Sequence, residues 1–299
     1  MKNISFLVIL LLSFNLTPLL SNDLDSNFLK ITDSKNREVI IKNEPERIIS
    51  LAPSITEIIY ALGGEKKLVG RTDYCDYPLS VTNISSIGSL WSPNIEKIVA
   101  LNPDIIIAST HFQKEVLEKL EDLNINVVVF EESGSLNGIY TDIKKIGLVL
   151  NKKDQAEDYA KQLESKITKL TEQVKNLEKP SVYYVVAYGD QGDYTAGGDT
   201  FISDLIELAG GNNIAKDSIG WGYSLEKIID KNPDIIICTN KFNTMDGLKM
   251  ATGYKFLPAI KNGKVYQINT DLIDRQGPRI ADGLEALISI IHPEIVIEN

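Results

Sequence analysis

The sequence predicts an α/β protein of two Rossmann-like lobes, each built on a parallel sheet and joined to the other by one long α-helix. Three observations lead to this fold class. The chain repeats itself after 130 positions, short apolar runs alternate with helical patterns in both halves, and a charged amphipathic stretch without Gly or Pro lies between the halves. The 299 residues are also enough for two domains of ordinary size.

The start of the chain has the pattern of a secretory signal peptide over residues 1–21. Lys2 is followed by the apolar run 6–12 and a weaker apolar stretch. This run is too short to cross a bilayer as a permanent helix, although an uncleaved anchor is the alternative because 19–21 is a poor cleavage site. No cysteine lies nearby for lipid attachment. We therefore expect a Sec-type export signal, followed by a first lobe over 22–151, a connecting helix over 152–179 and a second lobe over 180–299.

An internal repeat relates the two halves. Residues 91–107 read WSPNIEKIVALNPDIII and residues 221–237 read WGYSLEKIIDKNPDIII, with 10 of the 17 positions identical. A weaker match lies upstream, between 56–64 and 203–211. Each copy has the pattern of a helix closed by a Gly pair, a second helix, Asn-Pro-Asp and then a buried strand, because Gly permits a left-handed turn and Pro stops a helix.

Hydrophobic patterning also predicts further strands and the helix between the lobes. Short, mostly apolar runs at 47–51, 105–108 and 127–130 are typical of buried parallel strands. Residues 154–178 carry apolar side chains at helical spacing, and Pro180 ends the pattern. A coiled-coil arm is the alternative, but about three heptads are few for one. A stiff helical crossing predicts small lobe movements on ligand binding.

Composition excludes several classes of function. A net charge of −10, from 31 Lys and Arg against 41 Asp and Glu, offers no basic face to nucleic acid. Two His and two Cys are too few for a multi-His zinc site or an iron–sulfur cluster, so we expect no such metal site. The chain also lacks phosphate-loop, zincin and nucleophile-elbow motifs. We expect that it is not an enzyme; the rival hypothesis uses Asp73, Asp76 and Asp271 as acid or base, without a partnered nucleophile.

Two facing lobes create one cleft at the carboxyl ends of their strands, and the candidate ligand-binding residues follow those strands. Trp91 and Trp221 are the two tryptophans of the chain and occupy equivalent positions of the repeat. Together with Tyr74 and Tyr188 they suit a large planar or macrocyclic ligand. Core tryptophans copied by duplication are the alternative. His111, just after a strand, is a candidate metal ligand, although a lone loop histidine is more often solvated.

Glu96 and Glu226 form a second symmetric pair, each in the first turn of its helix and beside a Lys. Ordinary helix-dipole stabilisation, worth about 0.3–1 kcal/mol, explains either Glu alone. Two matching carboxylates at the rim of the cleft also suit a two-fold symmetric partner that carries basic pockets.

The two cysteines are expected to be free thiols. Cys75 and Cys238 are 163 positions apart and fall in different predicted lobes. A disulfide between them would lock the lobes together, although exported cysteines tend to pair.

Four motifs of the chain carry a family resemblance: RIISLAPSITE at 47–57, Asp-Tyr-Pro at 76–78, PNIEKI with Asn-Pro-Asp at 93–104, and Gly-Pro-Arg-Ile at 277–280. From about residue 37 to 291 the sequence resembles the class III periplasmic binding proteins of ABC importers, which bind cobalamin, haem and ferric siderophores. It is most similar to the cobalamin branch, whose pattern is a Tyr two residues before Asp-Tyr-Pro and a Trp in the cleft.

The resemblance implies a monomeric periplasmic protein that captures cobalamin or a related corrinoid and delivers it to an inner-membrane ABC permease with its ATPase. It implies no cofactor beyond this ligand. It further implies that the corrinoid is contacted by Tyr74, Trp91, Tyr188, Trp221 and Asp271, and that Glu96 and Glu226 dock onto arginines of the permease.

Departures from the cobalamin pattern keep haem or a ferric siderophore as the alternative ligand. Ser109 or its neighbours stand where that branch can place another Trp, and the two cysteines do not match its usual disulfide. Arg275 lies beside the Asp271 loop, and a cleft Arg favours an anionic ligand such as a haem propionate or a carboxylate siderophore. In that case Tyr74 or Tyr77 is a candidate haem ligand.

Overall fold

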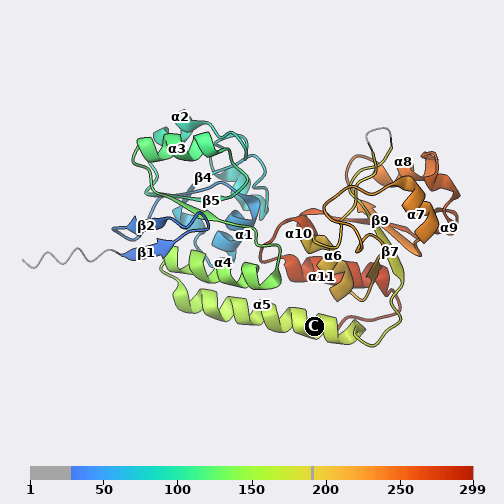
Figure 1. Cartoon of the computed structure of the whole chain (residues 1–299). Coiled ribbons are helices and arrows are strands. Elements are labelled where there is room, and N and C mark those ends of the chain that lie inside the picture. The colour runs from blue at the N-terminus through green and yellow to red at the C-terminus, as the bar shows by residue number, and fades with distance from the viewer. Residues whose placement is uncertain (1–27, 190–191, 299) are drawn as a thin grey trace, which may run out of the picture.

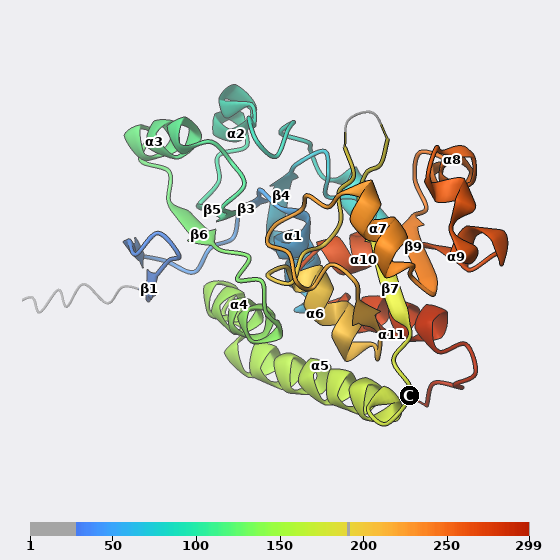
Figure 2. The same ribbon diagram turned by 45° about the vertical axis from the view of Figure 1, so that its right-hand side comes forward.

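Two α/β lobes lie side by side along one long helix, α5 (Lys153–Val174), in the computed structural model (Figure 1). The structure describes residues 28–189 and 192–298. The signal peptide expected over 1–21 therefore lies outside the described residues. One lobe precedes α5 in the chain and the other follows it, and Figure 2 shows both lobes on the same side of this helix.

The first lobe contains a four-stranded sheet in the order β4-β3-β5-β6, and all its pairings are parallel. The strands are β3 (Ile48–Ser50), β4 (Leu68–Arg71), β5 (Ile105–Ser109) and β6 (Val127–Phe130). The helices are α1 (Pro53–Ala61), α2 (Ile95–Ala100), α3 (Lys114–Asp122) and α4 (Leu136–Val149), with short 3₁₀ turns η1 (Glu65–Lys67) and η2 (Leu79–Asn83). An antiparallel hairpin, β1 (Leu29–Thr32) and β2 (Glu38–Ile41), precedes the sheet.

The second lobe has the same kind of sheet, in the order β10-β9-β7-β8, again wholly parallel. Its strands are β7 (Ser181–Val185), β8 (Asn212–Asn213), β9 (Ile235–Thr239) and β10 (Val265–Ile268). Its helices are α6 (Phe201–Leu208), α7 (Leu225–Lys231), α8 (Thr244–Met250), α9 (Pro258–Lys261), α10 (Asp271–Asp274) and α11 (Ile280–Ile291), with one 3₁₀ turn, η3 (Tyr254–Phe256). Two parallel sheets joined by one helix confirm the predicted fold class.

The two copies of the repeat fold alike. Over 91–100 and 221–230 the order of buried, half-buried and exposed positions is the same in both copies. Ile98 and Ile228 are fully buried anchors at equivalent positions. The helices α2 and α7 are capped in the same way, because the side chains of Asn94 and Ser224 each accept a hydrogen bond from the backbone N–H three residues further on.

The Asn-Pro-Asp triplet of each copy joins a helix to the sheet. Asn102 and Asn232 take left-handed φ angles of 45° and 44°, so each helix ends before the Pro that we expected to stop it. The carboxylate of Asp104 then accepts two backbone hydrogen bonds of 2.8 Å from the residues that lead into β3. Asp234 accepts one of 2.8 Å from the first residue of β7. Each Asp therefore holds the neighbouring strand in register with the strand that follows it.

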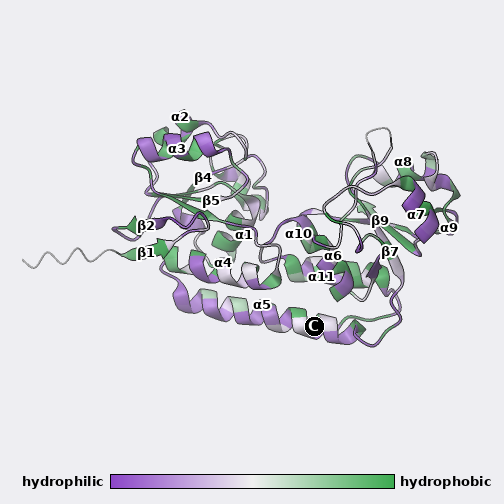
Figure 3. Ribbon diagram, in the orientation of Figure 1, coloured by the Kyte–Doolittle hydropathy of each residue, from purple (hydrophilic) through white to green (hydrophobic). Residues whose placement is uncertain are grey.

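Helix α5 supplies a core that both lobes share. Its buried side chains form one stripe: Ala156, Ala160, Leu163, Ile167, Leu170 and Val174. The helix spans about 33 Å at 1.5 Å per residue, with α4 of the first lobe over one end and α11 of the second lobe over the other (Figures 1 and 2). All of this stripe belongs to one buried hydrophobic cluster that includes strands of both sheets. Figure 3 shows the contrast between the mostly hydrophilic α5 and the hydrophobic strands.

A charged cluster forms a second link between the lobes. Glu57 on α1 has a side chain only 2% exposed and accepts hydrogen bonds from Arg275 (3.0 Å) and from two nitrogens of Arg279 (2.6 and 2.9 Å). Arg275 also pairs with Asp76 of the first lobe at 2.8 Å and with Asp271 at 3.4 Å. Because the acidic Glu57 and the two arginines come from opposite lobes, the cluster specifies how the lobes face each other.

Because Glu57 is buried, we expect its substitution to destabilise the fold. Glu57→Gln should lower the free energy of unfolding by about 3–5 kcal/mol, because it removes the charge that two largely buried guanidinium groups share. Urea titration followed by circular dichroism measures this. The exposed Glu131 is the control, and Glu131→Gln should change the free energy by less than about 0.5 kcal/mol. Equal effects of the two substitutions would contradict the role given to the cluster.

Candidate ligand-binding cleft

A cavity of about 440 Å³ lies between the lobes and is lined by both of them. The first lobe contributes the loops after β5 and β6, and the second contributes the start of α6, the loop before α7 and the end of α10. The lining residues are His111, Glu132, Gly134, Asp199, Thr200, Phe201, Ile202, Gly220, Trp221, Ile273, Asp274 and Gln276. Gln276 also crosses between the lobes, because its side-chain oxygen accepts a 2.9 Å hydrogen bond from the backbone of Gly134.

His111 and Glu132 form the wall on the first lobe. His111 follows β5, where Nδ1 lies 3.0 Å from the buried hydroxyl of Ser109. Its Nε2 lies 3.9 Å from a carboxylate oxygen of Glu132, which also accepts a hydrogen bond from Ser54. Burial raises the pKa of Glu132, and the neighbouring His111 acts in the opposite direction. The structure thus places His111 in the cavity, as expected of a metal ligand, although its role stays a prediction.

Trp221 and two carboxylates form the wall on the second lobe. Trp221 is 47% exposed, and its backbone carbonyl accepts a 2.8 Å hydrogen bond from Thr195. Asp199 accepts a 2.7 Å hydrogen bond from the backbone of Gly220. Asp274 still faces solvent in part, yet desolvation in the crevice and the nearby Asp271 raise its pKa to about 6.

The cavity is acidic. Three of its lining residues are carboxylates, and no Lys or Arg occurs among the lining residues that the structure describes. Arg275 follows the lining residue Asp274 in the chain, but it is only 13% exposed and already pairs with Glu57, Asp76 and Asp271. Asp271 is in turn paired with Lys241 at 2.8 Å. The ligand contacts predicted for Asp271 and Arg275 stay predictions, but both side chains are engaged in ion pairs.

Tyr74 and Trp91 form an aromatic pair on the first lobe, outside the residues that line the cavity. Their ring centroids lie 5.2 Å apart, edge to face, and the two residues are 45% and 49% exposed. The half-exposed rings leave apolar surface for a ligand. The alternative that Trp91 and Trp221 are core residues copied by duplication is wrong, since both tryptophans are about half exposed.

Tyr188 and Tyr194, two aromatic residues of the second lobe, differ in their exposure. The ring of Tyr188 is half-buried against Tyr254, with centroids 5.8 Å apart. Tyr194 is 41% exposed, and its backbone pairs with that of Gly222, next to Trp221. A ligand contact by Tyr188 stays a prediction, while Tyr194 is an exposed aromatic residue that we did not single out.

Both cysteines are free, as predicted, and the structure shows that both are buried. The thiol of Cys75 lies 3.2 Å from the hydroxyl of Thr72, and burial raises the pKa of both thiols, to about 11 for Cys238. A protonated, fully buried thiol is a poor metal ligand. Among the described residues no group of three or more His, Cys, Asp or Glu is placed to hold a metal ion.

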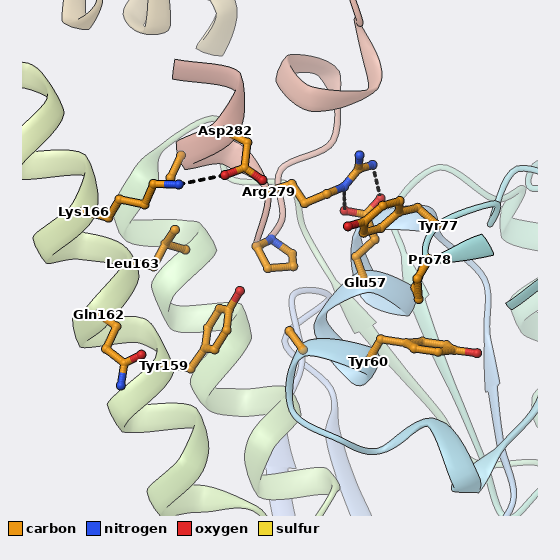
Figure 4. A pocket seen from close by; sticks show the side chains of 13 residues that line it. Glu57, Tyr60, Tyr77, Pro78, Tyr159, Gln162, Leu163, Lys166, Arg279 and Asp282 are labelled. Atoms are coloured by element: carbon orange, nitrogen blue, oxygen red, sulfur yellow. Dashed lines mark hydrogen bonds and ion pairs between the residues drawn. The ribbon is translucent and has the colours of Figure 1, made fainter. Parts of the chain in front are cut away.

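A second cavity, of about 480 Å³, adjoins the charged cluster where α1, α5 and the start of α11 meet (Figure 4). The guanidinium of Arg279 lies 3.9 Å from the ring centroid of Tyr77, and Lys166 pairs with Asp282 at 2.9 Å. The charged groups drawn in this cavity are thus paired with one another. Tyr77 lines this second cavity and does not line the first, so the two candidate haem tyrosines, Tyr74 and Tyr77, lie apart from it.

Glu96 and Glu226 are both exposed, in the first turns of α2 and α7. Both helices lie on the sides of their lobes away from α5 (Figures 1 and 2). The geometry therefore presents two equivalent carboxylates on one side of the molecule.

Two parallel-sheet lobes that share a helix, with a cavity lined by both of them, define a two-lobed solute-binding protein. The model of the periplasmic binding protein family matches residues 48–272, and the chain belongs to this family. Members of this class deliver ligands to ABC transporters and are not enzymes, which supports the non-enzyme expectation in general terms. In the part of the chain that is described, no helix is long and apolar enough to span a membrane.

Similar proteins include an uncharacterized ABC transporter substrate-binding lipoprotein, YvrC of Bacillus subtilis, which is 33% identical over 88% of this chain and 85% of its own. The vitamin B12 binding protein BtuF of Vibrio cholerae has a TM-score of 0.71 at 27% identity, over 83% of this chain and 97% of its own. The haem-binding protein RhuT of Roseiflexus sp. RS-1 has a TM-score of 0.77 at 26% identity, over 83% and 98%. The class is therefore established, whereas its members differ in ligand.

The raised carboxyl pKa values predict how stability depends on pH. Burial raises the pKa of Asp142 on α4 to about 7, and that of Asp274 is about 6, against roughly 3.9 in an unfolded chain. Between about pH 4 and 7 the folded state therefore binds more protons than the unfolded state, so the free energy of unfolding should fall as pH rises through this range. The lowered pKa values of Asp33, Asp76 and Asp234 act in the opposite direction, but below about pH 4.

Urea titrations at several pH values between 5 and 8 test this. Asp142→Asn with Asp274→Asn should flatten the profile, because Asn does not ionise. An unchanged slope in the double variant would contradict the assignment.

Proposed function

We propose that this binding protein captures cobalamin or a related corrinoid and delivers it to an inner-membrane ABC importer. It performs no reaction on its ligand and acts as a monomer in the periplasm, after removal of the signal peptide expected over 1–21. The relative YvrC is a lipoprotein, whereas the two cysteines of this chain are Cys75 and Cys238, both buried inside the lobes.

The acidic cavity is the observation that supports a corrinoid. The rim of a corrin carries neutral amide side chains, whose N–H groups donate hydrogen bonds to carboxylates such as Glu132, Asp199 and Asp274. Haem propionates and carboxylate siderophores are anions, and anions are held by free Arg or Lys. The nearby Arg275 is already balanced by three carboxylates. The charge pattern therefore favours a neutral or cationic ligand rich in donors.

Aromatic surface on both lobes supports a ligand larger than the cavity. Trp221 lies in the cavity wall, and the Tyr74–Trp91 pair is exposed on the first lobe. A macrocycle wider than the cavity would pack on Trp221, and the Tyr74–Trp91 pair offers further aromatic surface on the first lobe. Haem is the alternative ligand because His111, in the cavity wall, offers a ring nitrogen to an iron with an open position.

Titration of the purified protein with cyanocobalamin, hemin and ferric citrate tests the ligand, followed by tryptophan fluorescence and calorimetry. We expect saturable one-to-one binding of cyanocobalamin. Trp221→Ala should weaken it at least about tenfold without lowering the thermal midpoint, because the half-exposed ring packs on the ligand and not in the core.

Phe256→Ala is the matched control, since Phe256 is 62% exposed and lies on the second lobe by α9. Saturation with hemin alone would transfer the assignment to haem and His111. A thermal midpoint that falls in the Trp221 variant would contradict its place in the cleft.

The exposed glutamates are proposed to dock the loaded protein onto the importer. Glu96→Lys with Glu226→Lys should leave ligand affinity unchanged and abolish uptake of labelled cyanocobalamin, because both reversals repel basic pockets on the permease. Glu172→Lys on α5 is the control, since Glu172 is also exposed but lies on the connecting helix. Normal uptake by the double variant would contradict docking through these residues.

A further inference from the structure

Val99 and Ile229 occupy the same position in the two copies of the repeat, three residues after Glu96 and Glu226. Their exposed fractions are nearly equal, 47% and 49%. Residues three apart on a helix lie on the same face, so each glutamate has a half-exposed aliphatic side chain beside it. The molecule thus presents two equivalent patches, each made of one carboxylate and one aliphatic residue.

The neighbouring positions have not stayed apolar. Ala100 corresponds to Asp230, and Leu101 corresponds to Lys231. Position 99 keeps a β-branched aliphatic residue in both copies, although such residues are weaker helix formers than Ala and expose apolar surface when they face solvent. Neither helix propensity nor packing in the core accounts for Val99 and Ile229, because the residue that anchors each helix in the core is the buried Ile98 or Ile228.

We infer that Val99 and Ile229 are the apolar half of the surface that docks onto the importer. The inference rests on the proposed function and adds to it a contact that carries no charge. The partner that binds this surface is the permease dimer, with two equivalent pockets that each combine a basic group with an apolar floor. Charge complementarity to Glu96 and Glu226 and the matched exposure of the two copies both point to a two-fold partner.

A β-branched polar substitution tests the contact. Val99→Thr keeps the side-chain shape, and Ile229→Thr keeps the β-branch but also removes the δ-methyl group. In Val99→Thr with Ile229→Thr, the dissociation constant of the ligand-free chain for the importer in lipid nanodiscs should rise at least about tenfold, measured by biolayer interferometry. The exchange Val99→Ile with Ile229→Val keeps both apolar contacts and should stay within about twofold of the parent. Val296→Thr is the remote control, because Val296 is 87% exposed and lies after α11, near the C-terminus.

The dependence of binding on salt distinguishes the apolar contact of each patch from its charged contact. The loss in the threonine variant should be the same at low and high salt, whereas the loss caused by Glu96→Lys with Glu226→Lys should shrink at high salt, because ions screen charge but not apolar contact. The single threonine variants should weaken binding by similar factors, since the patches are equivalent. A loss confined to one helix would contradict the two-fold surface.

The failure of this inference differs from that of the proposed function. Parent-like binding by the threonine variant, with binding lost in the charge-reversed variant, would overturn the apolar contact and leave docking through the glutamates in place. Parent-like binding by both variants would overturn the docking proposal and this inference together.

Discussion

The apolar stripe along α5 is the constraint on which the arrangement of the molecule depends. Its six buried residues, from Ala156 to Val174, pack under α4 at one end and α11 at the other and merge the two lobes into one continuous core. A lobe that rotated far about this helix would expose that stripe, at a cost of about 25 cal/mol per Å² of apolar surface. We therefore expect little hinge closure and a cleft whose width is largely set before a ligand binds.

The charged cluster around Glu57 specifies the relative orientation of the two lobes, in addition to the distance between them that α5 sets. Buried ion pairs contribute little net stability when both partners are present, but they penalise arrangements that separate them. Glu57 comes from α1, while Arg275 and Arg279 come from the segment between α10 and α11, so the pairing forms only when the lobes face each other correctly. The same pairing occupies the arginine nearest the cleft, and the cavity is left with carboxylates as its charged groups. Lobe orientation and ligand preference are thus linked through one residue.

Much of the fold could be predicted from the sequence because its signals are local. The isoleucine runs became β5 and β9, and the helical spacing between the lobes became α5 with the expected buried face. The cleft is harder to predict, because the contacts between the lobes join residues 142 to 218 positions apart. In the sequence, Arg275 supports the alternative of an anionic ligand, yet it meets Glu57 across 218 positions, a pairing that follows only from the placement of the lobes. Likewise Tyr188 turns toward Tyr254, which no pattern within its own hairpin specifies.

The two copies of the internal repeat are alike on one face of the molecule and differ on the other. On the side of α2 and α7 the copies keep the same exposure at every position from 91 to 100 and from 221 to 230. At the cleft they differ, since Trp221 lines the cavity whereas Trp91 does not and instead meets Tyr74. Tyr74 lies in the stretch where the first copy carries 17 extra residues between its two matching blocks. A two-fold symmetric partner requires two equal surfaces, whereas a single ligand without that symmetry requires two different walls. A duplicated chain that binds both a symmetric partner and an asymmetric ligand is expected to keep its two copies alike on the partner side and to let them differ on the ligand side. The two copies of this chain differ in this way.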